Sequence, residues 1–420
     1  MKGFLARTAG AAGSLRAEVV RGSAGSFAVK ILNALLSFAV AVALARWLGA
    51  EAYGVYSFCL AVLMLTALPA QAGLPQLVVR ETAKAQVDGD WALMRGLWRW
   101  ANRFVLAASL FATLAVAGFL IAVEDPQRTE TMVLGLALVP IVAFANVRAA
   151  SLRGLRRVIH GQLPEGIVHP LTLLLLLGAI VLVGADSAAG PETAMILHVA
   201  ASIAAFFAGV ALLRVARPPD LIRTKARRTE PAAWARAVLP LALITGLHLI
   251  NSRADTILLG ILRSDAEVGI YRTATQMALL VIFGLQGLNQ VLQPHFARLH
   301  RQGDMARLQR LVTASARAIL ALALPPVLAY VLFGASLMAF IFGEPFRDGG
   351  IALAILALGQ LINAGMGSVG MLLTMTGHER DTLKGVAVAA VVNVILNLLL
   401  IPSFGMAGAA AATAISQLVW

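Results

Sequence analysis

Polar side chains recur on one face of the first long apolar segment of the sequence. They follow the spacing i, i+4, i+7 and i+11, and are Ser26, Lys30, Asn33 and Ser37. On a helix this spacing confines them to a sector of about 60°. Lys30 lies about 13 Å along the helix from the last flanking arginine, and a cation at that depth in hydrocarbon is costly. We therefore expect Lys30 to face a water-filled cavity that can hold an anion; the alternative is that it extends to the interface or pairs with a neighbouring helix.

A second polar face lies on the apolar segment 237–261. Its members are Thr245, His248, Asn251, Ser252 and Asp255. Arg253 lies about 160° away from Asp255 on an ideal helix, so these two side chains cannot pair without an unwound turn. Arg253 is a candidate for contacting a phosphate or a sugar, with a structural ion pair to another helix as an equal alternative. Asp255 is expected to accept hydrogen bonds at a helix end or between the halves of the protein, and is a candidate for binding a coupling ion.

A third polar face lies on segment 269–293. It carries Arg272, Gln276, Gln286 and Gln290. Amides donate and accept hydrogen bonds at once, which suits sugar hydroxyls, although membrane helices also use amides to contact one another. Arg272 has the alternative of extending to the outer interface. Asn393 and Asn397, further along the chain, are predicted to make packing contacts.

Titratable residues suggest one further coupling site. Glu165 and His169 lie one turn apart between two prolines, and such a pair could bind a proton, although most pairs near an interface are structural. His198 and His248 are expected to be hydrogen-bonded core residues. The sequence has no CxxC, HExxH, GxGxxG or Walker-type motif, so it predicts no metal, dinucleotide or ATP site and no cofactor.

The elements that position these residues must lie in lipid. Hydrophobic residues make up 59% of the 420 and charged residues 13%, and the mean hydropathy is +0.82. Backbone groups in lipid must bond within their own segment, so the chain is predicted to be all-α. Twelve membrane-spanning helices are expected, at 23–47, 55–78, 102–123, 130–150, 163–184, 193–213, 237–261, 269–293, 313–335, 350–374, 383–401 and 405–420.

Basic residues alternate between the two sides of these spans. Of the 34 lysines and arginines, 27 lie on one side, in the connections or at the adjoining ends of spans. Four fall on the other side: Arg46, Arg128, Arg263 and Arg347. This distribution predicts a cytoplasmic N-terminus, and it assigns the net charge of +13 to membrane topology and anionic lipids rather than to nucleic acid. The predicted divisions are a tail at 1–22, a six-helix lobe at 23–213, a basic cytoplasmic linker at 214–236 and a second six-helix lobe at 237–420.

An internal repeat relates the two lobes. LARWLGAEAYGVYS at 44–57 matches LGILRSDAEVGIYR at 259–272 with an offset of 215 residues between Gly54 and Gly269. An even number of spans separates the copies, so both lobes have the same orientation and a pseudo-twofold axis along the membrane normal.

Four stretches carry a resemblance to a known family. They are LARWLGAEAYGVYS at 44–57, LRGLRR at 152–157, ADTILLGILRSDAEVGIYRTA at 254–274 and LNLLLIPSFGMAGAAAATAIS at 396–416. In their order and spacing they resemble the polysaccharide transporters, or Wzx-type flippases, of the multidrug/oligosaccharidyl-lipid/polysaccharide exporter superfamily. The final span differs from the family in ending at Trp420 without a basic tail.

The resemblance implies a transporter and not an enzyme. It implies a cavity lined by the first, second, seventh and eighth helices, alternating access, and transport of polyprenyl-diphosphate-linked oligosaccharides to the periplasmic leaflet of a bacterial inner membrane, with glycan-assembly proteins as further partners. The expected substrate-binding residues are Lys30, Asn33, Arg253, Arg272, Gln276 and Gln290; the expected coupling residues are Glu165, His169 and Asp255.

Two other functions remain open from the sequence. A drug or cation exporter of the same superfamily would be expected to use intramembrane carboxylates rather than Lys30, Arg253 and Arg272. A membrane glycosyltransferase or ligase would be expected to need a larger non-membrane loop than the outer connections, none of which exceeds roughly fifteen residues on this segmentation.

Overall fold

The computed structural model contains helices joined by short connections. It describes residues 2–71, 73–120, 125–184, 189–226, 228–282, 292, 295–296, 298–367, 369–375 and 378–419, and within these the side chains from Gly25 onward except those at 119, 244, 374, 375 and 379. The helices are α1 (Lys2–Thr66), α2 (Leu68–Gln71), α3 (Leu74–Asp88), α4 (Trp91–Leu120), α5 (Pro126–Gly135), α6 (Leu138–Gly154), α7 (Val158–Leu163), the π-helix η1 (Pro164–Val168), α8 (His169–Leu182), α9 (Pro191–Ala216), α10 (Pro219–Arg223), α11 (Pro231–Leu262), α12 (Asp265–Val281), α14 (Met305–Phe342), the 3₁₀ helix η3 (Glu344–Gly349), α15 (Gly350–Met366), α16 (Val369–Met375) and α17 (Glu379–Val419).

The described residues contain nine segments long and apolar enough to cross a membrane. Two of them contain a glycine with a positive φ that divides the helix, Gly49 in α1 (φ 76°) and Gly405 in α17 (φ 54°). Each of these helices therefore supplies two of the predicted spans. Helix α12 begins the eighth predicted span, whose second half falls largely outside the described residues. The all-α, polytopic prediction is confirmed, and the protein is a multi-pass membrane protein.

The second predicted span, 55–78, has different bounds in the structure. The helical path is interrupted near Ala67 and again before Leu74, and then continues as α3 to Asp88. Gly73 adopts a left-handed conformation (φ 73°), and a proline follows at the start of α3. Because proline lacks a backbone donor and fixes φ, this Gly-Leu-Pro sequence ends one helix and begins another.

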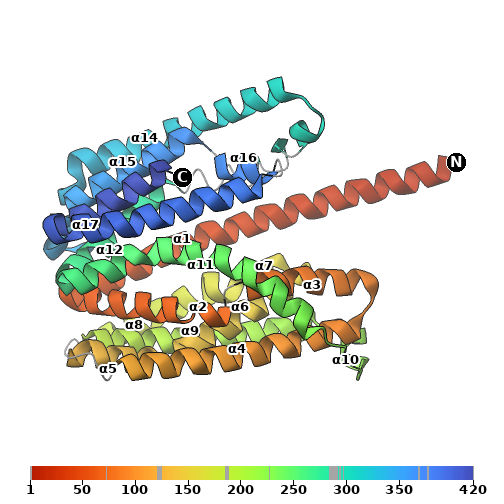
Figure 1. Cartoon of the computed structure of the whole chain (residues 1–420), viewed down its shortest axis with the longest axis horizontal. Helices are drawn as coiled ribbons and strands as arrows, with labels where there is room; N and C mark the ends of the chain where they lie inside the picture. The colour runs from red at the N-terminus through yellow and green to blue at the C-terminus, as the bar shows by residue number, and fades with distance from the viewer. Residues whose placement is uncertain are drawn as a thin grey trace.

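The helices gather in two bundles. Helices α2 to α10 form one bundle and α12 to α17 the other, while α1 and α11 run between them (Figure 1). We call the first the N-lobe, which includes α1, and the second the C-lobe, which includes α11. Connections rich in arginine, such as the one that contains α10, lie at the end of the molecule near the N-terminus, which we call the basic end (Figure 1). The opposite end, which contains Gly49 and Asp265, is called the acidic end.

The two lobes meet through their repeated glycines. A Cβ atom on Gly54 would lie 1.7 Å from the carbonyl oxygen of Asp265, and one on Gly269 would lie 2.1 Å from the carbonyl oxygen of Ala50. The two contacts are equivalent under the offset of 215 residues that the sequence repeat shows. The backbones of α1 and α12 therefore approach closely and symmetrically, which requires residues without a side chain at both positions.

The tyrosines of the repeat show the same relationship within the lobes. The Tyr56 hydroxyl lies 2.7 Å from Nδ1 of His198, and the Tyr271 hydroxyl lies 3.3 Å from Oγ1 of Thr413. Both partners are 142 residues from their tyrosine, so the repeat extends from the second helix of each lobe to the sixth.

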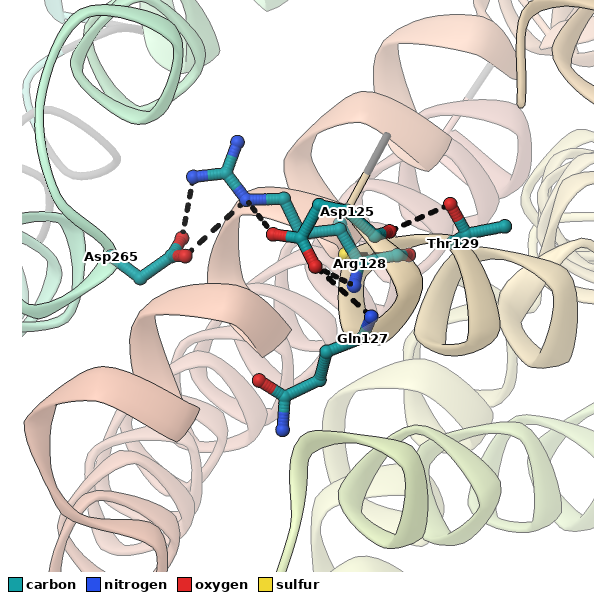
Figure 2. A network of polar contacts seen from close by, with 6 residues as sticks. Asp125, Gln127, Arg128, Thr129 and Asp265 are labelled. Atoms are coloured by element: carbon teal, nitrogen blue, oxygen red, sulfur yellow. Dashed lines mark hydrogen bonds and ion pairs between the residues drawn. The ribbon is translucent and has the colours of Figure 1, made fainter. Parts of the chain in front are cut away.

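An ion pair adds to the contact at the acidic end. The Arg128 guanidinium, at the start of α5, donates to both carboxylate oxygens of Asp265 in α12, at 2.9 and 3.3 Å (Figure 2). It lies 4.5 Å above the ring of Phe58 and also contacts Asp125, at 3.4 Å. Arg46 adds bonds to the backbone carbonyls of Phe340 and Ile341. The lobes are therefore joined at this end by both packing and charge.

Replacing either repeated glycine by alanine tests the symmetric contact. We expect Gly54→Ala and Gly269→Ala each to lower the free energy of unfolding by about 1–3 kcal/mol, because an added methyl group forces two backbones apart. Thermal unfolding of the purified protein in detergent measures this. Gly118→Ala is the control, since nothing lies within 4 Å of its added Cβ. Equal stability of all three variants would contradict the close approach.

Candidate functional site

Two adjoining cavities lie between the lobes. One, of about 340 Å³, lies between the first half of α1 and α12, and Lys30, Asn33 and Gln276 are among its lining residues. The other, of about 160 Å³, lies closer to the acidic end and is lined by α1, α8, α9, α11 and α12. Both include Ser37 and Gln276, so we treat them as one central cavity. The helices named by the family resemblance line it, and α8 and α9 contribute as well.

Three cations line the central cavity. Lys30 comes from α1, Arg253 from α11 and Arg272 from α12. None of them forms an ion pair within the described part of the chain. The structural ion pair considered for Arg253 is thus not formed with any described carboxylate. Positive charge without a compensating carboxylate gives this cavity the electrostatics of an anion-binding site.

Helix α11 turns Arg253 and Asp255 to different sides, as their spacing predicts. Arg253 lies in the cavity wall, whereas Asp255 is 8% exposed and lies within the C-lobe. The Asp255 carboxylate accepts hydrogen bonds from Tyr271 at 2.9 Å, from Asn397 at 2.9 Å and from Thr413 at 2.5 Å. These partners belong to α12 and α17 of the same lobe. Of the two expectations for Asp255, a bond at a helix end or one between the lobes, the structure shows neither among its described partners. Asn397, predicted to make packing contacts, does so through its hydrogen bond to α11 and does not line the central cavity.

Two histidines and a tyrosine form a continuous polar wall on the N-lobe side of the cavity. His169 and His198 stack edge to face with ring centroids 4.6 Å apart. His198 in turn bonds to Tyr56, and all three line the central cavity. The sequence predicts a hydrogen-bonded His198, and the bond to Tyr56 agrees with that, but the position of His198 in the cavity wall is not predicted. The partner of His198, Tyr56, is 142 residues away in the sequence. Only the internal repeat, which contains Tyr56, could have indicated this contact from the sequence.

Glu165 and His169 do not bond to each other in the structure. Glu165 lies in the π-helical turn η1, between α7 and α8, and is not among the residues that line the cavity. Nε2 of His169 is buried and has no hydrogen-bond partner among the described residues. The proline at the start of η1 gives a reason for the wider turn, because it removes a backbone donor from the helix.

The remaining predicted residues have mixed placements. Asn33 lines the cavity and accepts a bond from Ser37 at 3.1 Å. Thr245 accepts a bond from Gln76 of the N-lobe at 3.1 Å and is not among the cavity-lining residues. Gln286 and Gln290 lie outside the described residues. Of the six candidate substrate-binding residues, the structure brings five together around one cavity.

Thiol labelling tests whether water reaches this cavity. In a Cys59→Ala background, which removes the single native cysteine, we expect Gln276→Cys to react with a water-soluble maleimide. Ala274→Cys should not react, because Ala274 lies two residues earlier on the same helix and is fully buried. Labelling is measured by the mass of the intact protein in detergent. Equal reactivity at both positions, or none at either, would contradict a water-filled cavity beside Gln276.

The Asp255 network is expected to stabilise the C-lobe. Asp255→Ala should lower the free energy of unfolding by about 1–3 kcal/mol for each buried donor left without an acceptor, whereas Asp255→Asn should cost less because its amide oxygen still accepts. Thermal unfolding in detergent measures both. Asp348→Ala, at an exposed carboxylate, is the control; a loss as small as that of the control would show that the network contributes little.

Comparisons with known proteins agree with this architecture. A sequence model described as "Polysaccharide biosynthesis protein" matches residues 19–300. Over 407 residues the chain is 22% identical to "Probable low-salt glycan biosynthesis flippase Agl15" of Haloferax volcanii, covering 95% of this chain and 81% of that protein.

Two solved structures have the same fold. One is "Lipid II flippase MurJ, inward closed conformation", with a TM-score of 0.73, 12% identity and coverage of 95% of this chain and 85% of that one. The other is an inward-facing multidrug resistance MATE family transporter of the MOP superfamily, with a TM-score of 0.77, 14% identity and coverage of 94% and 95%. The fold is thus that of the predicted superfamily, and, because the sequence model covers well over half of its length, the chain belongs to the polysaccharide biosynthesis protein family.

Proposed function

We propose that the protein moves a polyprenyl-diphosphate-linked oligosaccharide from the cytoplasmic to the periplasmic leaflet of a bacterial inner membrane, by alternating access of two lobes, for polysaccharide or O-antigen synthesis. Membership of the polysaccharide biosynthesis protein family and similarity to a probable glycan biosynthesis flippase of Haloferax volcanii support a transporter of lipid-linked glycans rather than an enzyme. The observation that carries the proposal is the central cavity with three cations and no described carboxylate partner for them.

Electrostatics favours an anionic passenger. Between low-dielectric helices a diphosphate gains more from nearby cations than it does in bulk water. Lys30, Arg253 and Arg272 would offset its charge, whereas a cationic drug would be repelled by the same groups. The buried carboxylate of α11, Asp255, is already bonded within the C-lobe and faces away from this space. A cation exporter therefore has less support than a flippase.

The neutral polar groups of the cavity suit the sugar part of the substrate. Asn33 and Gln276 carry amides that donate and accept hydrogen bonds, as hydroxyl-rich ligands require. Tyr53 and Tyr56 add aromatic surface with hydroxyl groups on the N-lobe side. Phosphates held by the cations and sugars held by amides and rings would together select a glycan with a charged anchor. Gln290 is also proposed to contact the sugar, because the sequence places it on the same helical face as Arg272 and Gln276.

Ion coupling is proposed at the histidine wall. His169 lines the cavity and has a buried ring nitrogen without a described partner, so a proton there would lie beside the passenger. Glu165, in the π-helical turn before it, is proposed to relay that proton. Asp255 is the alternative coupling residue. To bind a coupling ion, its carboxylate would first have to lose its hydrogen bonds to Tyr271, Asn397 and Thr413.

The distribution of basic residues supports a proposed orientation. The sequence assigns 27 lysines and arginines to the basic end, so we propose, on the positive-inside rule, that this end and the N-terminus face the cytoplasm. The contacts between the lobes at the acidic end would then close the periplasmic side in this conformation.

Glycan-assembly proteins are proposed as partners on the ground of the family alone.

Reconstituted protein provides the test. We expect it to move a fluorescent polyprenyl-diphosphate sugar between vesicle leaflets, and Lys30→Ala and Arg272→Gln each to slow this movement at least about tenfold, the equivalent of one lost charge contact of about 1.4 kcal/mol. Lys225→Ala, at an exposed lysine of the linker, is the matched control.

Stability of each variant is checked by thermal unfolding before transport is measured. Wild-type rates in folded Lys30→Ala and Arg272→Gln protein would remove the cationic cavity from the mechanism. Transport of a polyprenyl-monophosphate sugar and of a cationic dye is measured in parallel, and a preference for the dye would support the exporter instead.

A further inference from the structure

A separate cavity of about 730 Å³ lies within the N-lobe at its basic end. Its lining comes from α4, α6, α9 and α10, and it shares no lining residue with the central cavity. The transport proposal therefore makes no use of it. We call it the lateral pocket.

The lateral pocket is strongly basic. Its lining includes five arginines, Arg95, Arg99, Arg103, Arg148 and Arg217, and no aspartate or glutamate. None of the five forms an ion pair in the described part of the chain. Such a concentration of like charge is unfavourable unless an anion occupies the space between the guanidinium groups.

The inner wall of the pocket holds its arginines in place without neutralising them. The Arg148 guanidinium lies 4.0 Å from the ring centroid of Phe206 and 5.5 Å from that of Phe144, and its Nη1 is buried without a hydrogen-bond partner among the described residues. Arg217 lies 5.9 Å above the ring of Trp98. Aromatic rings orient these cations but supply no negative charge to neutralise them.

Positive charge is also unbalanced at the edge of the pocket. Burial, followed by the positive charges of Arg214 and Arg95, lowers the pKa of Arg217 below its usual value. Arg95 itself donates to the backbone carbonyl of Thr224, which supplies a dipole but no negative charge. A phosphate group would relieve the repulsion and accept several of the unused donors at once.

The rim of the pocket favours a lipid over a soluble anion. Along α4, Arg95, Arg99 and Arg103 are followed on the same face by the apolar residues Leu106, Leu110 and Leu114. These three leucines are 59%, 59% and 63% exposed. Charge at the basic end of this face and exposed hydrocarbon beyond it match the head group and acyl chain of a membrane lipid.

We propose that the lateral pocket binds the phosphate head group of an anionic phospholipid from the leaflet at the basic end, with the acyl chains lying along the leucine face of α4. The site is independent of the central cavity and of the proposed transport. A bound lipid would bridge α4, α6 and α9 and so stabilise the N-lobe.

Native mass spectrometry of the purified protein tests the proposal. With phosphatidylglycerol and phosphatidylcholine of equal chain length, we expect retention of phosphatidylglycerol in preference. The variant Arg99→Gln/Arg103→Gln should reduce that retention at least about tenfold, given roughly 1 kcal/mol for each basic residue near a lipid surface, and should leave phosphatidylcholine retention unchanged. Adding Arg148→Gln should reduce it further.

Charge-matched controls separate the pocket from general surface charge. Arg301→Gln/Arg310→Gln removes the same number of exposed arginines from the basic end outside the pocket and should leave phosphatidylglycerol retention unaltered. Both double variants keep the half-buried Arg148, and thermal unfolding checks that each is folded. Equal loss of lipid in the two double variants would overturn the proposal.

Inorganic phosphate distinguishes a lipid site from a simple anion site. We expect millimolar phosphate to displace little phosphatidylglycerol, because the acyl chains add binding that phosphate lacks. Thermal stability should rise with phosphatidylglycerol in wild-type protein and not in Arg99→Gln/Arg103→Gln. Full displacement by phosphate, or equal stabilisation by phosphate and phosphatidylglycerol, would show that the pocket binds a soluble anion and contradict the lipid assignment.

Discussion

The close approach of α1 and α12 at Gly54 and Gly269 is the contact on which the arrangement of the lobes depends. Each glycine lies against a backbone carbonyl of the other helix, and the two contacts are equivalent under the internal repeat. Because both sides of the contact are backbone, little lateral movement is tolerated there. The Arg128–Asp265 pair and the bonds of Arg46 lie at the same end, so the lobes are fixed at the acidic end and enclose space further along.

That constraint places the cations of the central cavity. Arg272 follows Gly269 by one turn on α12, so a contact that fixes the glycine also fixes the direction of the arginine. Arg253 reaches the same space from α11, while its neighbour Asp255 bonds to α12 and α17 and holds α11 in the C-lobe. One helix thus supplies both a structural anchor and a cavity cation, because two residues of separation turn side chains to nearly opposite sides.

Much of this was predictable from local spacing, and the rest depends on distant partners. Helical periodicity placed Lys30, Asn33 and Gln276 on faces that do meet, and the repeat identified Gly54 and Gly269. The boundaries of the second span were not predictable from hydropathy, since a Gly-Leu-Pro turn extends the path to Asp88. The role of His198 could not be inferred either, because stacking on His169 requires α8 and α9 to be packed side by side.

The lateral pocket was missed for a related reason. Its arginines lie in or next to three predicted connections on the same side, and each group alone is explained by membrane topology. Only folding brings Arg99 and Arg103 of α4 opposite Arg148 of α6, with no described carboxylate between them. Topology requires positive charge at the basic end but does not require it to be concentrated around a hollow lined with aromatic rings. The lateral pocket therefore has more positive charge than orientation in the membrane explains, and a phosphate ligand accounts for the excess.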